Sequence, residues 1–353
     1  MFKELDAALE ALERNRDLST EAFGEYDQVY NGDLKKWIKY ANSLKLRMAM
    51  RLSYIDEQTA KAKAAEAIAD GVITENADNA KLQPELNRTA LLWNSWQDHA
   101  IGADILCYMN GYKDPRMEKM FLANDVGDYV GIRIGIDVTS KSQAMSKYSN
   151  MIVASDTPYL WFNAAEATFL HAEYELRWGS AETAKTLYEQ AVRLSFEERG
   201  ASGADAYLVD ATKKPAPYTD PLGNYSASAR SEITVPWETA TDGRDTEAVQ
   251  ERNLERIIVQ KWIAIFPLGV EAWSEHRRTG YPKLLPVPTD KSGGSVNVEQ
   301  GARRLPYPVE EYQQNNANLQ AAIQTLGAEQ QNGDRSGDVM GTRVWWDCKP
   351  YNK

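Results

Sequence analysis

The residue types that most often carry chemistry are few and dispersed in this chain. The histidines His99, His171 and His276 form no HExxH pair and have no cysteine at metal-ligand spacing. Cys107 and Cys348 are far apart and outside any CxxC arrangement, which indicates neither a zinc site nor a disulfide framework. The sequence also lacks a GxSxG elbow and the glycine-rich loops that hold nucleotide phosphates. We therefore expect no catalytic metal, no activated nucleophile and no cofactor.

Acidic side chains leave other chemistry open. Two groups lie in expected loops, where carboxylates could bind calcium: Asp242, Asp245 and Glu247, and then Asp334 and Asp338. Neither group has EF-hand spacing, which favours solvated loop carboxylates. The 51 acidic residues also supply many pairs for glycoside hydrolysis, in which the carboxylate separation is spatial. A helical glycoside hydrolase or lyase therefore stays open as an alternative.

Aromatic residues are unusually abundant. The chain holds 10 tryptophans and 18 tyrosines, many in or beside expected loops. Flat rings bury a large area at low conformational cost, which suits recognition of sugar faces or of peptides. Most single tryptophans nevertheless pack inside proteins, so abundance alone does not assign a role to any one ring.

Net charge and hydropathy exclude several partners. The 40 Lys and Arg against 51 Asp and Glu leave a net charge of −11. This balance disfavours nucleic acid and an anionic lipid surface as main partners. The sequence contains no apolar run of the roughly 18 residues that a transmembrane helix needs.

The elements that must position these residues are mostly helices. Apolar residues recur at three- and four-residue steps over residues 37–71 and 163–199, and each segment is expected to form an antiparallel helical hairpin. In the second segment Ala172, Ala184, Tyr188 and Ala191 have the spacing of tetratricopeptide contacts, although an ordinary helix pair remains equally compatible. Further helices are expected at residues 2–12, 89–109, 253–266, 270–278 and 318–326, the last stopped by Gly327. Long irregular segments at 111–158, 200–247 and 281–308 separate them, so we expect an all-α scaffold with a loop-rich, ligand-facing half.

The expected helix over residues 89–109 separates two tryptophans by its periodicity. Trp96 shares a face with apolar residues and is expected in the core. Trp93 shares a face with hydrogen-bonding residues and with Tyr108, and the helix leads into a loop that carries Tyr112 and Tyr129. A sugar-binding surface combines rings with polar groups. We therefore expect Trp93, Tyr108, Tyr112 and Tyr129 to contact a ligand.

Several segments together resemble the SusD/RagB family, in particular its SusD-like branch. They follow one another along nearly the whole chain: residues 32–47 (GDLKKWIKYANSLKLR), 111–116 (GYKDPR), 164–173 (AAEATFLHAE), 260–262 (QKW) with 271–273 (EAW) and 277–282 (RRTGYP), 303–308 (RRLPYP), and 341–347 (GTRVWWD). The resemblance implies one domain over residues 1–353, built on tetratricopeptide-like hairpins. It also implies a role without catalysis.

The resemblance further implies a ligand, a partner and a location. The family binds oligosaccharides, or in some branches peptides, and delivers them to a TonB-dependent SusC-like transporter at the outer membrane. Members are surface lipoproteins with a signal peptide, a lipidated cysteine and further helices before the region matched here. We therefore expect an N-terminally truncated member whose membrane attachment is a lipid anchor outside this sequence. A cytoplasmic helical-repeat adaptor stays open as a second alternative, because the sequence begins inside a helical pattern without a signal peptide.

Overall fold

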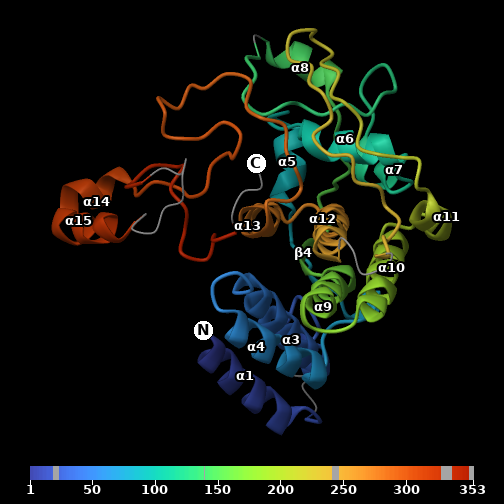
Figure 1. Ribbon diagram of the computed structural model, residues 1–353, viewed down its shortest axis with the longest axis vertical. Helices are drawn as coiled ribbons and strands as arrows, with labels where there is room; N and C mark the ends of the chain where they lie inside the picture. Colours follow the sequence, from blue (N-terminus) through green and yellow to red (C-terminus); the bar gives the residue numbers. More distant parts are fainter. Residues whose placement is uncertain (19–23, 139, 241–245, 327–335, 350–353) are drawn as a thin grey trace.

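Helices are the main regular structure of the protein, joined by long irregular segments and two short antiparallel ribbons (Figure 1). The computed structural model describes residues 1–18, 24–138, 140–240, 246–326 and 336–349. Its elements, in chain order, are α1 (Phe2–Asn15), α3 (Leu34–Arg51), α4 (Glu57–Asp70), a 3₁₀ turn η1 (Asn76–Asp78), β1 (Ala80–Leu82), α5 (Arg88–Asn94), α6 (Ala103–Tyr112), α7 (Met117–Met120), β2 (Phe121–Leu122), α8 (Lys141–Lys147), β3 (Asn150–Met151), β4 (Tyr159–Phe162), α9 (Ala164–Trp178), α10 (Ala181–Glu198), α11 (Ala204–Val209), α12 (Thr246–Ala264), α13 (Gly269–Thr279), α14 (Val309–Gln314) and α15 (Asn316–Thr325). The expected all-α scaffold is confirmed.

The first expected hairpin is formed by α3 and α4, with α1 packed beside α3 at the same end of the molecule (Figure 1). Asp33 caps α3 by accepting the backbone N–H groups of Lys35 and Lys36, and Asp56 caps α4 in the same way. The face of α4 that packs inward consists of the fully buried Ala60, Ala64 and Ala67. These small side chains let the two helices approach closely, so the predicted hairpin is confirmed.

The second expected hairpin is formed by α9 and α10. Asn163 and Ser180 cap the two helices through their side-chain oxygens. The residues at tetratricopeptide spacing all point inward, because Ala172, Ala184, Tyr188 and Ala191 are each 0% exposed. Their alternation of small and large side chains fills the space between the helices. The helical period was therefore sufficient to predict this pair.

Two large apolar clusters make up the interior. One lies between α3, α4 and α9, and the other between α6, α9, α10 and α12. Leu194 on α10 packs against both clusters. In Figure 1 the helical hairpins occupy one end and the middle of the long axis, whereas α6, α7, α8 and long irregular segments occupy the other end.

A buried ion-pair network joins helices that are distant in sequence. The Arg278 guanidinium donates to both oxygens of Glu173 on α9, each at 2.7 Å, and also to Glu275. Lys261 on α12 and Arg51 on α3 also pair with Glu275, at 2.8 and 2.9 Å. Buried charges are tolerated when each is paired and hydrogen-bonded, as here. The network fixes α13 against three other helices.

The single helix expected over residues 89–109 is wrong. The chain instead forms α5, which ends at Asn94, and α6, which begins at Ala103. Between them, the backbone N–H of Ile101 donates to the carbonyl of Ser149 at 2.9 Å, and the side-chain amide of Asn150 donates to the carbonyl of His99 at 2.5 Å. These bonds to a distant segment replace the helical bonds that local periodicity favoured.

The remaining expected helices are present with shifted ends. They correspond to α1, α12, α13 and α15, whereas the expected stop at Gly327 lies outside the described residues. The expected irregular segments carry short elements of their own: α7, β2, α8 and β3 in the first, and α11 in the second. Within the described ranges, no helix combines the length and apolar character of a membrane span.

Candidate functional site

Two of the four expected ligand-binding rings lie in the interior. Tyr108 and Tyr112 are 3% and 2% exposed, and their rings meet edge to face at 6.1 Å. The Tyr112 hydroxyl donates to the carbonyl of Ile233 at 3.1 Å, and Trp262 on α12 covers Tyr108. The expectation that these rings form a surface with Trp93 is therefore wrong. Its cause is the break between α5 and α6, which removes the shared helical face on which the expectation depended.

Trp93 lies near the end of α5 and is partly exposed. Its ring stacks on that of His99, with ring centroids 6.1 Å apart and an angle of 24° between the planes. The His99 ring also lies 3.3 Å from the carbonyl of Thr89 through Nε2. Trp93 therefore offers a partly accessible ring whose orientation is fixed by its neighbour.

Trp96 is the most exposed ring of this region and was expected in the core. Its exposed fraction is 60%, because the chain turns away from the helical path directly after α5. The backbone N–H groups of Trp96, Gln97 and Asp98 all bond back to carbonyls of α5 at 2.9 to 3.2 Å, and Gln97 adopts a left-handed φ of 56°. The ring thus projects from an ordered turn.

The sequence around Trp96 also contains residues that indicate a helix end, although the apolar periodicity favoured a continuous helix. The residues around it, Asn94, Ser95, Gln97 and Asp98, are polar and typical of a helix end, and Gly102 precedes the next helix. Asp98 pairs with Lys141 of α8, which ties the turn to a separate segment. Reading the polar run as a helix end would have placed Trp96 in a loop.

Tyr129, the fourth expected ring, lines a pocket of about 310 Å³ beside α6. We refer to it as the α6 pocket; its lining residues come from α6, residues 128–131 and residues 216–219. Tyr129 is partly buried against the apolar cluster, and its carbonyl accepts the Asn110 side-chain amide at 2.7 Å. The structure therefore places Tyr129 at an opening, apart from the buried Tyr108 and Tyr112.

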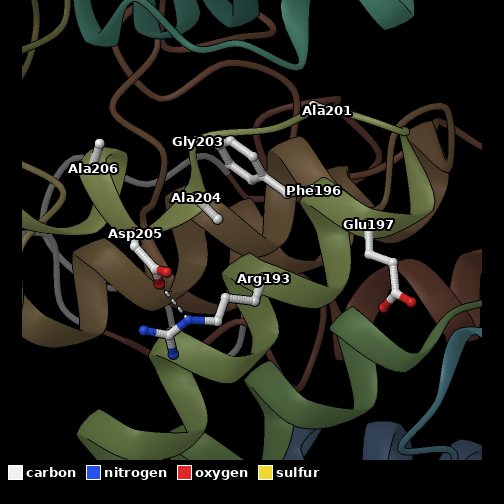
Figure 2. A pocket seen from close by; sticks show the side chains of 8 residues that line it. All are labelled: Arg193, Phe196, Glu197, Ala201, Gly203, Ala204, Asp205 and Ala206. Carbon is white, nitrogen blue, oxygen red and sulfur yellow. Dashed lines mark hydrogen bonds and ion pairs between the residues drawn. The ribbon is translucent and has the colours of Figure 1, made fainter.

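Two other surface hollows have less suitable linings for a sugar. Figure 2 shows the pocket between α10 and α11, of about 480 Å³, where Arg193 pairs with Asp205 at 2.8 Å. The one ring in its lining, Phe196, is only 1% exposed. A second hollow of about 490 Å³ is lined by Tyr26, Trp37 and Trp161 with Gln28 and Asp27, and the Asp27 carboxylate is already bonded to Trp37 and to backbone N–H groups. Sugar sites require polar groups beside the rings.

The described residues contain no cluster of three or more His, Cys, Asp and Glu side chains suited to a metal ion. Asp338, from one expected acidic group, binds Arg304 and the backbone of Tyr307. Asp242, Asp245 and Asp334 lie outside the described residues. Burial and the nearby charge of Arg303 lower the pKa of His276 to about 4, so this histidine is a neutral packing residue at physiological pH.

Known proteins resemble this chain over nearly its full length. The crystal structure of a SusD homologue from Bacteroides thetaiotaomicron is 48% identical to this chain. The match covers 99% of this chain and 73% of the homologue, with a TM-score of 0.92. A SusD homologue from Bacteroides uniformis is 42% identical, covering 99% and 72%, with a TM-score of 0.89. A chitin-binding SusD homologue from Flavobacterium johnsoniae is 38% identical, covering 98% and 71%, with a TM-score of 0.88.

The sequence also matches a family model over most of its length. No curated protein sequence matched the chain. The model of the SusD-like family, described as SusD and RagB outer membrane lipoproteins, matches residues 1–347. The tetratricopeptide-like hairpins, the buried motif residues and these matches agree, and the chain therefore belongs to the SusD-like family.

Proposed function

We propose that this protein captures oligosaccharides at the cell surface and does not act on them chemically. The observation that carries the proposal is Trp96, which is 60% exposed on an ordered turn beside the stacked rings of Trp93 and His99. A flat ring held in a fixed position provides a surface for the apolar face of a sugar at little conformational cost. The chitin-binding relative supports a carbohydrate as the ligand class.

The aromatic residues have different roles in this proposal. Trp96 and Trp93 contact the sugar directly, and Tyr129 contributes through the α6 pocket. Tyr108 and Tyr112 lie in the interior, where they pack α6 into the apolar cluster. Trp96, which was expected in the core, is thus proposed as a ligand contact, and Trp93 keeps its expected role as a ligand contact.

A binding role agrees with the state of the buried carboxylates. Burial alone would raise the pKa of Glu173, but the charges of Arg278 and Arg177 hold it below its ordinary value. A glycosidase general acid requires the opposite shift. Burial does raise the pKa of Asp104. This side chain is only 7% exposed and accepts the backbone N–H of Leu285 at 2.6 Å, so it has a structural role rather than that of a general acid.

The ligand class is tested with a panel of oligosaccharides and peptides. Isothermal titration calorimetry should detect binding of at least one neutral oligosaccharide, with N-acetylglucosamine and glucose oligomers as the first probes. The same mixtures should release no new reducing ends after prolonged incubation. Binding of peptides alone would contradict the carbohydrate assignment. Sustained release of reducing ends by purified protein would favour the glycoside hydrolase or lyase.

We further propose that the protein is a surface lipoprotein that passes its ligand to a SusC-like TonB-dependent transporter. Family membership supports this step. Purification of the full-length protein from native outer membranes should recover a β-barrel transporter in stable association. Recovery of the protein from the cytoplasm instead, with no transporter, would favour the helical-repeat adaptor.

A further inference from the structure

The α6 pocket has walls that are held in place by backbone contacts. The backbone N–H of Ala216 donates to the carbonyl of Cys107 on α6 at 2.9 Å, which anchors one wall. On the opposite wall, a Cβ atom at Gly131 would lie 2.4 Å from the carbonyl oxygen of Gly102. Only glycine permits this approach to α6 without a shift of backbone. The pocket is therefore a fixed feature of the fold, and its volume of about 310 Å³ falls at the small end of ligand pockets.

The lining of the α6 pocket combines a ring with opposite charges. Tyr129 supplies a partly exposed ring. The side-chain N–H of Asn110 donates to the Tyr129 carbonyl, and its amide oxygen is an acceptor in the pocket lining. Lys113 and Asp128 are exposed at the same pocket, and neither forms an ion pair with any residue that the structure describes. A sugar hydroxyl both donates and accepts hydrogen bonds, so it can use the lysine and the carboxylate together. The balanced charges favour a neutral sugar over a uronic acid or a cationic amino sugar.

The segment that lines the α6 pocket is connected to the turn that carries Trp96 by backbone hydrogen bonds. The segment after Trp96 bonds to the next segment through Ile101 N–H and the Ser149 carbonyl, at 2.9 Å. Ser149 in turn donates its backbone N–H to the carbonyl of Val130 at 2.7 Å, and Val130 lines the pocket. Ala103, another lining residue, follows Trp96 closely enough in the chain that their Cα atoms are separated by at most about 25 Å. An oligosaccharide of several residues can span a separation up to this limit.

From this lining and this connection we infer that the α6 pocket is a second subsite, which binds the terminal residue of a neutral oligosaccharide while an inner residue stacks on Trp96. The inference rests on the proposed capture of oligosaccharides. It adds a prediction that the proposed function alone does not make. Affinity should increase with chain length, and the increase should depend on Lys113 and Asp128.

The test compares calorimetric affinities for N-acetylglucosamine oligomers from the dimer to the hexamer, or for the neutral series that the panel selects. In the double variant Lys113→Met and Asp128→Asn, affinity for the hexamer should fall at least about tenfold, because hydrogen bonds to two charged groups are lost. Affinity for the dimer, which reaches Trp96 only, should be unchanged. Both residues are exposed, so the thermal midpoint should not move.

Two controls separate failure of this inference from failure of the proposed function. Asp125→Asn changes an exposed carboxylate of the same loop that does not line the pocket, and it should leave both affinities unchanged. Trp96→Ala should weaken binding of every length. If the double variant keeps the wild-type dependence on length, the subsite is overturned while capture at Trp96 stands. If only charged oligosaccharides bind the wild-type protein, the subsite is overturned, and if no oligosaccharide binds, both are overturned.

Discussion

The Trp93 ring is partly covered by His99 and partly open to solvent, so its removal should affect binding more than folding. We predict that Trp93→Ala weakens oligosaccharide affinity by about 1 to 3 kcal/mol, the range of a well-packed aromatic contact. Trp93→Phe, which retains a ring, should lose less. Calorimetry with the ligand selected by the panel measures both variants. Unchanged affinity in Trp93→Ala would remove this residue from the site.

His276 makes the folded state sensitive to mild acid. Burial and Arg303 lower the pKa of His276 to about 4, whereas an exposed histidine in the unfolded chain titrates near 6.5. The unfolded chain therefore binds a proton first as the pH falls. This histidine's contribution is fully present above about pH 6.5, and by about pH 4 the free energy of unfolding should have fallen by about 3 kcal/mol.

The variant His276→Gln tests this dependence, because glutamine can still donate to the carbonyl of Pro282, which lies 3.0 Å from the histidine Nδ1. Urea unfolding between pH 7 and 4 should show a shallower loss of stability in the variant than in the wild-type protein. Burial also lowers the pKa of His171. His171 is present in the variant and in the wild-type protein, so its effect cancels from the comparison. Parallel curves for the two proteins would contradict the assignment.

At the scale of elements, Arg278 holds α13 against α9. Its guanidinium is 0% exposed and binds Glu173 through two hydrogen bonds of 2.7 Å. We predict that Arg278→Ala lowers the free energy of unfolding by about 3 to 5 kcal/mol, because it leaves a buried carboxylate without its partner. The matched control is Arg193→Ala, which breaks the exposed pair with Asp205 and should lower it by at most about 1 kcal/mol. Equal losses in denaturant unfolding would argue against the buried network.

Local sequence features predict the helical hairpins but not the break between α5 and α6. Helical hairpins follow from local features, namely the caps at Asp33 and Asn163 and the small residues at helical spacing. The break between α5 and α6 depends on bonds from residues 99–101 to residues 149–150, which no local pattern contains. Trp96 was misplaced for this reason. The α6 pocket was also beyond prediction, because its walls come from three separate segments.

At the scale of the whole molecule, the two apolar clusters share helix α9 and are both contacted by Leu194 of α10. We predict that the chain unfolds as one domain over residues 1–353, because neither cluster can open without exposing that shared surface. Denaturant unfolding followed by tryptophan fluorescence and by far-ultraviolet circular dichroism should give coincident transitions. Two separated transitions would instead indicate independent folding units.

Trp96 is the central ligand-binding ring in the proposed capture of oligosaccharides, and an ordered turn displays it. The decisive measurement is the calorimetric affinity of Trp96→Ala for the neutral oligosaccharide that binds the wild-type protein best, compared with Trp345→Ala, a control at a tryptophan that is 69% exposed elsewhere. We predict that Trp96→Ala loses about 1 to 3 kcal/mol of binding free energy, with an unchanged thermal midpoint, and that the control loses neither affinity nor stability. Wild-type affinity in a folded Trp96→Ala protein, or an equal loss in the control, would contradict it.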